Sequence, residues 1–164
     1  MILISDTGPL IALAKIGKIE FLKNLAWKAV FIPPMVQREL WGKIGSESAE
    51  IESGLNVFIQ VTSFQKSDTR LETATADLDE GEKQVIISGA LVNEEVFLLL
   101  DDQRGRDVAK HLEIPIIGTV GILLLAKRRG LIQQVLPLLH ELREKGYWLS
   151  DALVRHVRRM AKED

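Results

Sequence analysis

The sequence predicts an α/β protein in which helices cover both faces of a mainly parallel sheet. Short runs rich in Val, Ile, Leu and Phe alternate along the chain with segments of helical periodicity. This alternation is typical of strand–helix–strand units, which build parallel sheets. The 164 residues, 46% of them hydrophobic, can bury a substantial core. We therefore expect residues 1–164 to form a single domain.

Five runs have the composition of strands, and most of them lead into a helical pattern. The predicted strands are residues 2–5, 29–32, 57–61, 96–100 and 115–118. The predicted helices are two within 9–25 that separate near Gly17, and one each within 33–45, 81–95, 104–112, 120–130, 133–146 and 151–163. Gly146 is a stop for the seventh helix, and Ser150 is a cap for the last. Residues 63–81 are polar and weakly patterned, which indicates a loop or a partly helical excursion.

Composition excludes several classes of protein. The chain has no cysteine, so neither disulfides nor thiolate metal ligands are available. No apolar stretch approaches the roughly 20 residues needed to span a bilayer, and we expect a cytoplasmic protein without membrane contacts. The net charge is −2, but residues 1–100 hold 9 Lys and Arg against 14 Asp and Glu, whereas residues 101–164 hold 12 against 9. A polyanion would therefore favour the second half of the chain, and a cation the first.

The most informative residue near the N-terminus is Asp6, which follows the first predicted strand. Asp6 with Thr7, Gly8 and Pro9 is good chemistry for a turn and a helix start, and Thr7 can cap that helix. A carboxylate beyond the carboxyl end of a parallel strand is also where an open sheet binds its ligands. Position 6 alone does not decide between these roles.

Two glutamates lie on apolar helix stripes. Glu39 shares a stripe with Val36 and Leu40, although a surface glutamate would occupy the opposite face. Glu82 shares its stripe with Val85 in the first turn of the next long helix. There it could also stabilise the helix dipole by about 0.3–1 kcal/mol. Each glutamate taken alone favours a structural role over a catalytic one.

A pair of aspartates, Asp101 and Asp102, directly follows a strand that is apolar throughout. Adjacent like charges require a cation, an arginine partner or a raised pKa. Arg104 and Arg106 are the nearest candidates for such ion pairs. Alternatively, Asp101 ends its strand at the same sheet edge as Asp6.

If the strands that precede Asp6 and Asp101 are neighbours, three or four carboxylates converge, with Glu39 and Glu82 contributed by helices. Carboxylates without His or Cys suit Mg²⁺ or Mn²⁺ rather than Zn²⁺. Such a site typically activates water and neutralises charge on a phosphodiester. The alternative is a set of scattered structural acids.

With these four acids in this order, the chain resembles the PIN-domain superfamily of metal-dependent ribonucleases. The segments ISDTGPLIALAKIG, FIPPMVQREL, LDEGEKQVIISGA, LLLDDQRGRDVAKHLEIPIIGTVGILLLAKRRGLI and LREKGYWLSDALVRHVRRM resemble a branch related to VapC-type toxins and catalogued as a domain of unknown function. The resemblance spares mainly residues 45–75. It implies an α/β/α sandwich around a parallel sheet, with C-terminal helices in about 131–164 packed on it.

The resemblance also implies an activity, a site and partners. It implies a Mg²⁺- or Mn²⁺-dependent endoribonuclease with Asp6, Glu39, Glu82 and Asp101 as catalytic residues. The expected metal ligands are Asp6, Glu82, Asp101 and Asp102, the last assisting or replacing Asp101. We expect RNA as substrate, a homodimer, and a small antitoxin as partner. The candidate substrate contacts are Thr7, Arg104, Arg106 and Thr119, with Lys127, Arg128 and Arg129 as further candidates on the RNA backbone; helix capping is the alternative role of Thr119.

Other functions compete with this interpretation. A haloacid-dehalogenase phosphotransferase requires a second Asp at the position of Gly8, and a receiver domain requires its acid pair after the first strand. Both are disfavoured. A catalytically silent PIN-like module acting through protein contacts stays open, with ILLLA and the C-terminal helices as its interface. His111, His140 and His156 have no partner spacing, and the three tryptophans are too scattered to indicate a base-stacking platform.

Overall fold

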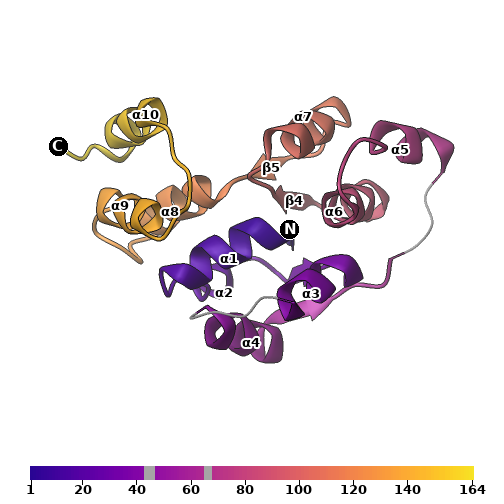
Figure 1. Ribbon diagram of the computed structural model, residues 1–164, viewed down its shortest axis with the longest axis horizontal. Helices are drawn as coiled ribbons and strands as arrows, with labels where there is room; N and C mark the ends of the chain where they lie inside the picture. The colour runs from indigo at the N-terminus through magenta and orange to yellow at the C-terminus, as the bar shows by residue number, and fades with distance from the viewer. Residues whose placement is uncertain (43–46, 65–67) are drawn as a thin grey trace.

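A computed structural model describes residues 1–42, 47–64 and 68–164. Within these segments the chain forms a five-stranded sheet in the order β3-β2-β1-β4-β5, and every neighbouring pair is parallel. The strands are β1 (Ile2–Ser5), β2 (Val30–Ile32), β3 (Ile59–Val61), β4 (Val96–Leu99) and β5 (Ile116–Ile117). Helices flank this sheet in a three-layer α/β/α arrangement (Figure 1), which confirms the predicted fold class.

The strand order places a switch point between β1 and β4. From β1 the chain proceeds outward to β2 and β3, and it then crosses back to β4 and β5 on the other side. Ser5 pairs with Leu99, so the two strands end side by side. Open parallel sheets bind ligands in the crevice beyond the carboxyl ends of the strands at such a point. The condition for convergence, that the strands before Asp6 and Asp101 are neighbours, is met.

The helices cover the sheet and build a C-terminal layer. They are α1 (Thr7–Lys15), α2 (Phe21–Asn24), α3 (Pro34–Trp41), α4 (Ser48–Val57), α5 (Thr69–Ala74), α6 (Glu80–Leu91), α7 (Gln103–His111), α8 (Thr119–Arg128), α9 (Leu136–Glu144) and α10 (Asp151–Ala161). Helix α6 packs on β1 and β4, and α8 packs on α1, α2 and α10. In Figure 1, α8–α10 lie on one side of the view and α5–α7 on the other, with the end of β4 between them.

The core explains why β1 and β4 are almost wholly apolar before their acids, with the buried Ser5 as the one polar residue of the two strands. Leu3, Leu98 and Leu99 are fully buried, as are Leu13 of α1 and Ile86 of α6. Burial of each such side chain contributes about 1.5–3 kcal/mol. The two strands are therefore held rigidly up to the residues that precede Asp6 and Asp101.

The structure differs from the sequence prediction mainly around α4. The run at 57–61 is strand only from Ile59, because Val57 ends α4 and is 63% exposed. Helix α4 itself was not predicted, since its pattern offers only Ile51 and Gly54 as buried positions. The polar excursion at 63–81 is partly helical, as α5 shows. Residues 43–45 of one predicted helix and 65–67 of the excursion lie outside the described residues.

The length and hydropathy of the helices bear on the prediction that the chain has no membrane contacts. None of the helices in the described segments is long and apolar enough to cross a bilayer.

Candidate metal centre

Asp6 follows β1 and stands at the N-cap position of α1. Its backbone N–H donates to the carbonyl of Leu99 at 3.1 Å, which continues the β1–β4 ladder to the last residue before the helix. Its carboxylate makes no capping hydrogen bond. The expectation that Thr7 caps this helix is wrong, because Thr7 is already the first helical residue. The Asp6 carboxylate is thus placed by backbone geometry and kept free of a capping role.

Glu39 reaches the same end of the sheet from α3. Val36 and Leu40 are buried on its stripe, as the sequence pattern indicated. The buried hydroxyl of Thr7 donates to Oε2 of Glu39 at 2.6 Å. Thr7, predicted to contact substrate, is therefore placed where it orients Glu39.

The first turn of α6 brings two more acids to this region. Glu82 is 6% exposed, and its backbone N–H donates at 2.9 Å to Asp79, which caps the helix. A side chain at Gly81 would bring its Cβ within 3.2 Å of Cδ of Glu39 and 3.4 Å of Oδ1 of Asp79. Gly81 thus allows the Glu39 and Asp79 carboxylates to approach the same turn. The sequence interpretation missed Asp79, although an acid three residues before Glu82 matches a capping box.

Asp101, after β4, is the most heavily hydrogen-bonded acid of the site. Its Oδ1 accepts the backbone N–H of Thr119 at 2.8 Å, and its Oδ2 accepts the Thr119 hydroxyl at 2.6 Å and the hydroxyl of Tyr147. Thr119 does not cap α8, because Gly118 holds the N-cap position. Tyr147, 46 residues away in sequence, was not foreseen, and no local pattern marks it. These donors fix the orientation of the Asp101 carboxylate.

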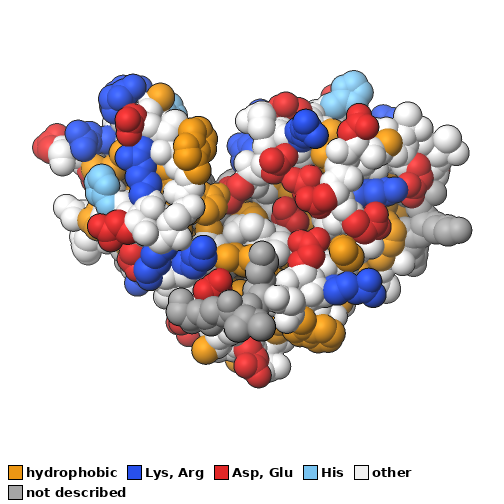
Figure 2. Space-filling view, in the orientation of Figure 1, with side chains coloured by type: hydrophobic (Ala, Val, Ile, Leu, Met, Phe, Trp, Pro, Cys, Tyr) orange, Lys and Arg blue, Asp and Glu red, His pale blue; other side chains and the backbone are white. Residues whose placement is uncertain are grey.

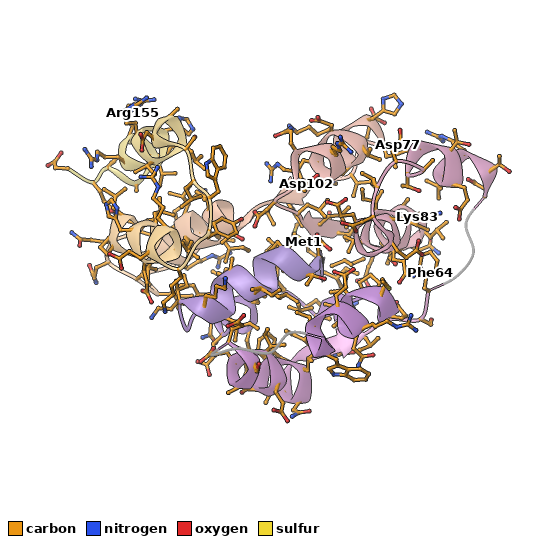
Figure 3. The ribbon with its side chains drawn as sticks, in the orientation of Figure 1. Met1, Phe64, Asp77, Lys83, Asp102 and Arg155 are labelled. Carbon is orange, nitrogen blue, oxygen red and sulfur yellow. The ribbon has the colours of Figure 1, made fainter. Side chains whose placement is uncertain are left out.

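The residues that follow Asp101 have structural partners. Asp102 is exposed and caps α7, accepting the backbone N–H of Arg104 at 2.9 Å and that of Gly105 at 3.5 Å. Arg106 donates to the carbonyl of Leu100 at 2.9 Å, and the Arg104 side chain is exposed. Asp102 therefore stands at the rim of the site, at the start of α7 (Figure 3).

The basic run at the end of α8 lies apart from the carboxylates. Lys127 pairs with Glu163 at 2.7 Å and donates to the carbonyl of Ala161 at 2.7 Å, so it ties the C-terminus to α8. Arg128 and Arg129 line a groove shared with Trp27, on the far end of β1 from Asp6. The expected contacts of these three residues with RNA have no support in their placement.

The carboxylates act on one another electrostatically. Burial raises the pKa of Asp6 from 3.8 to about 7, against a backbone hydrogen bond from Thr7, and repulsion from Asp79, Glu39 and Asp101 adds to the rise. Burial likewise raises the pKa of Glu82 from 4.5 to about 7. Asp79 adds most to that rise, followed by Asp102 and Asp6. The charges of the two helices and the two strand ends thus reach one region. In Figure 2, red side chains gather in the hollow between α8–α10 and α5–α7.

The donor set suits a hard divalent cation, because it consists of carboxylates and hydroxyls. A cation would also favour the ionised forms that burial disfavours at Asp6 and Glu82. Among the residues that the structure describes, no three acidic or imidazole side chains are already close enough to hold a metal ion. The residues therefore fit such an ion in chemistry and charge, and its binding would require their side chains to converge further.

Comparison with known families identifies the class of protein that carries this fold. A family model described as DUF3368, PIN domain, matches residues 2–163. The chain therefore belongs to the PIN-domain family. Membership indicates a nuclease-type function, since PIN domains are generally nucleases that bind nucleic acid and usually use divalent metal ions. None of the curated proteins compared with the chain matches it.

Proposed function

We propose that this chain is a Mg²⁺- or Mn²⁺-dependent endoribonuclease that hydrolyses phosphodiester bonds of RNA. The observation that carries the proposal is the placement of Asp6 and Asp101 after neighbouring parallel strands, with Glu39 and Glu82 directed to the same region from α3 and α6. These carboxylates repel one another, and a bound divalent cation would offset that repulsion.

Each residue then has a distinct role. Asp6, Glu82 and Asp101 would hold the metal, and Glu39 would complete the site. Thr7 orients Glu39, and Thr119 and Tyr147 orient Asp101. When bound, the ion supplies Lewis-acid polarisation of the phosphate and a lowered pKa for an attacking water. The carboxylates would position that chemistry at the carboxyl ends of β1 and β4, where an RNA strand would enter from the hollow.

The biological setting that we propose is a toxin–antitoxin pair. The order of motifs resembles VapC-type toxins, which act on RNA, form dimers and are neutralised by a small antitoxin. We propose these partners for this chain on that resemblance alone. Copurification with the product of a neighbouring small gene, and growth arrest on expression without it, are the corresponding observations.

A second candidate function is a catalytically silent PIN-like module, and one observation favours it. Both oxygens of Asp101 already accept hydrogen bonds, three in all. If those bonds persist in solution, Asp101 has little capacity left for a metal ion. The chain would then act through protein contacts rather than through hydrolysis.

Cleavage of RNA by the purified chain distinguishes the two candidates. Single-stranded and structured RNAs should be cut with Mg²⁺ or Mn²⁺ and left intact with a chelator. Asp6→Asn and Asp101→Asn should each reduce the rate by at least about a hundredfold, because each removes a ligand charge. Glu80→Gln is the matched control, because Glu80 is exposed on the same helix as Glu82 and its carboxylate accepts a hydrogen bond from the side chain of Gln84.

Two results would contradict the proposal. Cleavage that persists in both aspartate variants would come from another nuclease or another site. Absence of cleavage together with absence of Mn²⁺ binding in calorimetry would support the silent module instead.

A further inference from the structure

Trp148 is the most exposed large hydrophobic side chain in the described part of the protein, at 83%. A side chain of this size is rarely left so accessible, because it presents a large apolar area to water. It lies in the segment between α9 and α10. The indole is therefore accessible to a ligand.

The segment around Trp148 is held from its N-terminal side. Gly146 adopts a φ of +88°, which glycine reaches without strain, and its N–H donates to the carbonyl of Arg143 at 3.0 Å. The N–H of Tyr147 donates to the carbonyl of Leu142 at 2.9 Å. This pair of bonds is a Schellman motif, which ends α9 and fixes the direction of the chain that follows.

The segment is held from its C-terminal side as well. Leu149 is buried, and the guanidinium of Arg143 donates twice to its carbonyl, at 3.0 and 2.6 Å. Ser150 caps α10 by accepting the N–H of Leu153 at 3.1 Å. Trp148 is thus an exposed side chain on a backbone that is anchored at both neighbours, and little conformational entropy remains to be lost when it binds.

The anchored segment touches the candidate metal centre. The hydroxyl of Tyr147 donates to Asp101, and burial and the Asp101 charge raise its pKa, so that it stays a donor. Consecutive Cα atoms are about 3.8 Å apart, so Trp148 begins one backbone step from a residue in contact with that carboxylate. The exposed indole therefore belongs to a segment that is attached directly to the candidate metal centre.

The helix that follows Trp148 is cationic. Exposed side chains of α10 include Arg155, Arg158 and Arg159, with Lys162 at its C-cap. Blue side chains gather over α10 in Figure 2, and Arg155 is marked there in Figure 3. Positive charge next to an exposed aromatic ring is the combination with which proteins bind single-stranded nucleic acid. A protein partner would favour an apolar surround for Trp148, whereas most exposed side chains of α10 are charged, with Met160 as the large apolar exception.

We propose that Trp148 is a stacking platform for one unpaired nucleobase of an RNA strand that lies across the candidate metal centre. The inference rests on the proposed function in that it takes RNA as the ligand. The backbone of the strand would lie toward the cations of α10, and the stacked base would hold the adjacent phosphodiester near Asp101. The platform recognises any base with a free face, so it selects single strands over duplexes.

Binding of a short single-stranded RNA, measured with Asp6→Asn as background so that the RNA stays intact, tests this site. Trp148→Ala should weaken binding by about fivefold to a hundredfold, and Trp148→Phe should retain most of it. RNA should quench indole fluorescence, and the quenching should disappear in Trp148→Phe. The same RNA in a duplex should bind Trp148→Ala and its parent equally.

Trp41→Ala is the matched control. Trp41 is 70% exposed, but it follows Glu39 by two residues and is thus about 200° around α3. It should leave RNA affinity and quenching unchanged. Equal affinity of Trp148→Ala and its parent, quenching that persists in Trp148→Phe, or a dimer that dissociates on Trp148→Ala would overturn the inference.

Experiments can refute the stacking platform and the proposed nuclease function independently. If the wild-type chain cleaves RNA and Trp148→Ala does so with unchanged kcat/KM, the platform is refuted and the nuclease stands. If single strands bind through Trp148 and no RNA is cleaved, the nuclease is refuted and the platform stands.

Discussion

Removal of the Asp6 charge should stabilise the folded protein, and the gain should depend on pH. Asp6→Asn keeps the size of the side chain and the N-cap preference of the position, so charge is the main change. Burial, with repulsion from Asp79 and Glu39, raises the pKa of Asp6 from 3.8 to about 7. A tenfold change in proton affinity corresponds to about 1.4 kcal/mol. The folded state therefore holds ionised Asp6 at a cost of about 4 kcal/mol.

The sign follows from proton binding in the two states. Below about pH 4 Asp6 is neutral in both, and it contributes no difference. Between about pH 4 and pH 7 the unfolded chain has released the proton and the folded chain still holds it, so the free energy of unfolding falls as the pH rises. Above pH 7 the loss is complete. Asp6→Asn should then match the wild type near pH 4 and exceed its stability by up to about 4 kcal/mol at pH 8.

Urea unfolding in a chelator at several pH values measures this difference. Asp77→Asn, at an exposed position in the turn before α6, should change stability by less than about 0.5 kcal/mol throughout. Mn²⁺ should reduce the advantage of Asp6→Asn, because an ion at 100 times its Kd stabilises the wild type by about 2.7 kcal/mol. A variant no more stable than the wild type at pH 8 would refute the argument that burial and repulsion at Asp6 outweigh its hydrogen bond from Thr7.

Two further substitutions test the packing around the carboxylates. Tyr147→Phe removes a hydrogen bond to the Asp101 carboxylate, and urea unfolding should show a loss of about 1–2 kcal/mol; unchanged stability would mean that the bond is not formed in solution. Gly81→Ala places a methyl group against the Glu39 carboxylate while favouring the helix by up to about 1 kcal/mol, so thermal melting should change little and Mn²⁺ affinity should fall. Unchanged affinity would indicate that Glu39 moves aside freely.

The hydrogen bonds that Thr119 and Tyr147 donate to Asp101 bear on both candidate functions, the nuclease and the silent module. Thr119 comes from the start of α8 and Tyr147 from the segment after α9, so the C-terminal helices complete the environment of an acid supplied by the sheet. Tyr147→Phe frees part of Oδ2. A gain in metal affinity in this variant would favour the silent module, whereas a loss would favour a positioning role for the hydroxyl.

The sequence alone was enough to assign Asp6 and Asp101 to strand ends and Glu39 and Glu82 to the buried faces of helices. Short, mainly apolar runs define β1 and β4, and the first charged residue after each, Asp6 or Asp101, marks the end of the strand, because a buried parallel strand has few places for a charge. The helical stripes of Val36 with Glu39 and of Val85 with Glu82 directed both glutamates inward, since a 3.6-residue period is a local property. Helix α4 was not predicted, because only Ile51 and Gly54 are buried in it and its local pattern is therefore weak.

Only the tertiary structure decided which acids act on one another electrostatically and what surrounds them. That β4 rather than β3 lies beside β1 is a long-range pairing that no local pattern encodes. Tyr147 contacts Asp101, and Asp79 caps the helix that carries Glu82, so both reach the site only through tertiary packing. The raised pKa values of Asp6 and Glu82 arise from burial in the folded protein. Trp148 is one of three tryptophans scattered in the sequence, and only the tertiary contact of Tyr147 with Asp101 links its segment to the carboxylates. Local periodicity orients a side chain on its own element, whereas proximity between elements is set by the packing of the whole core.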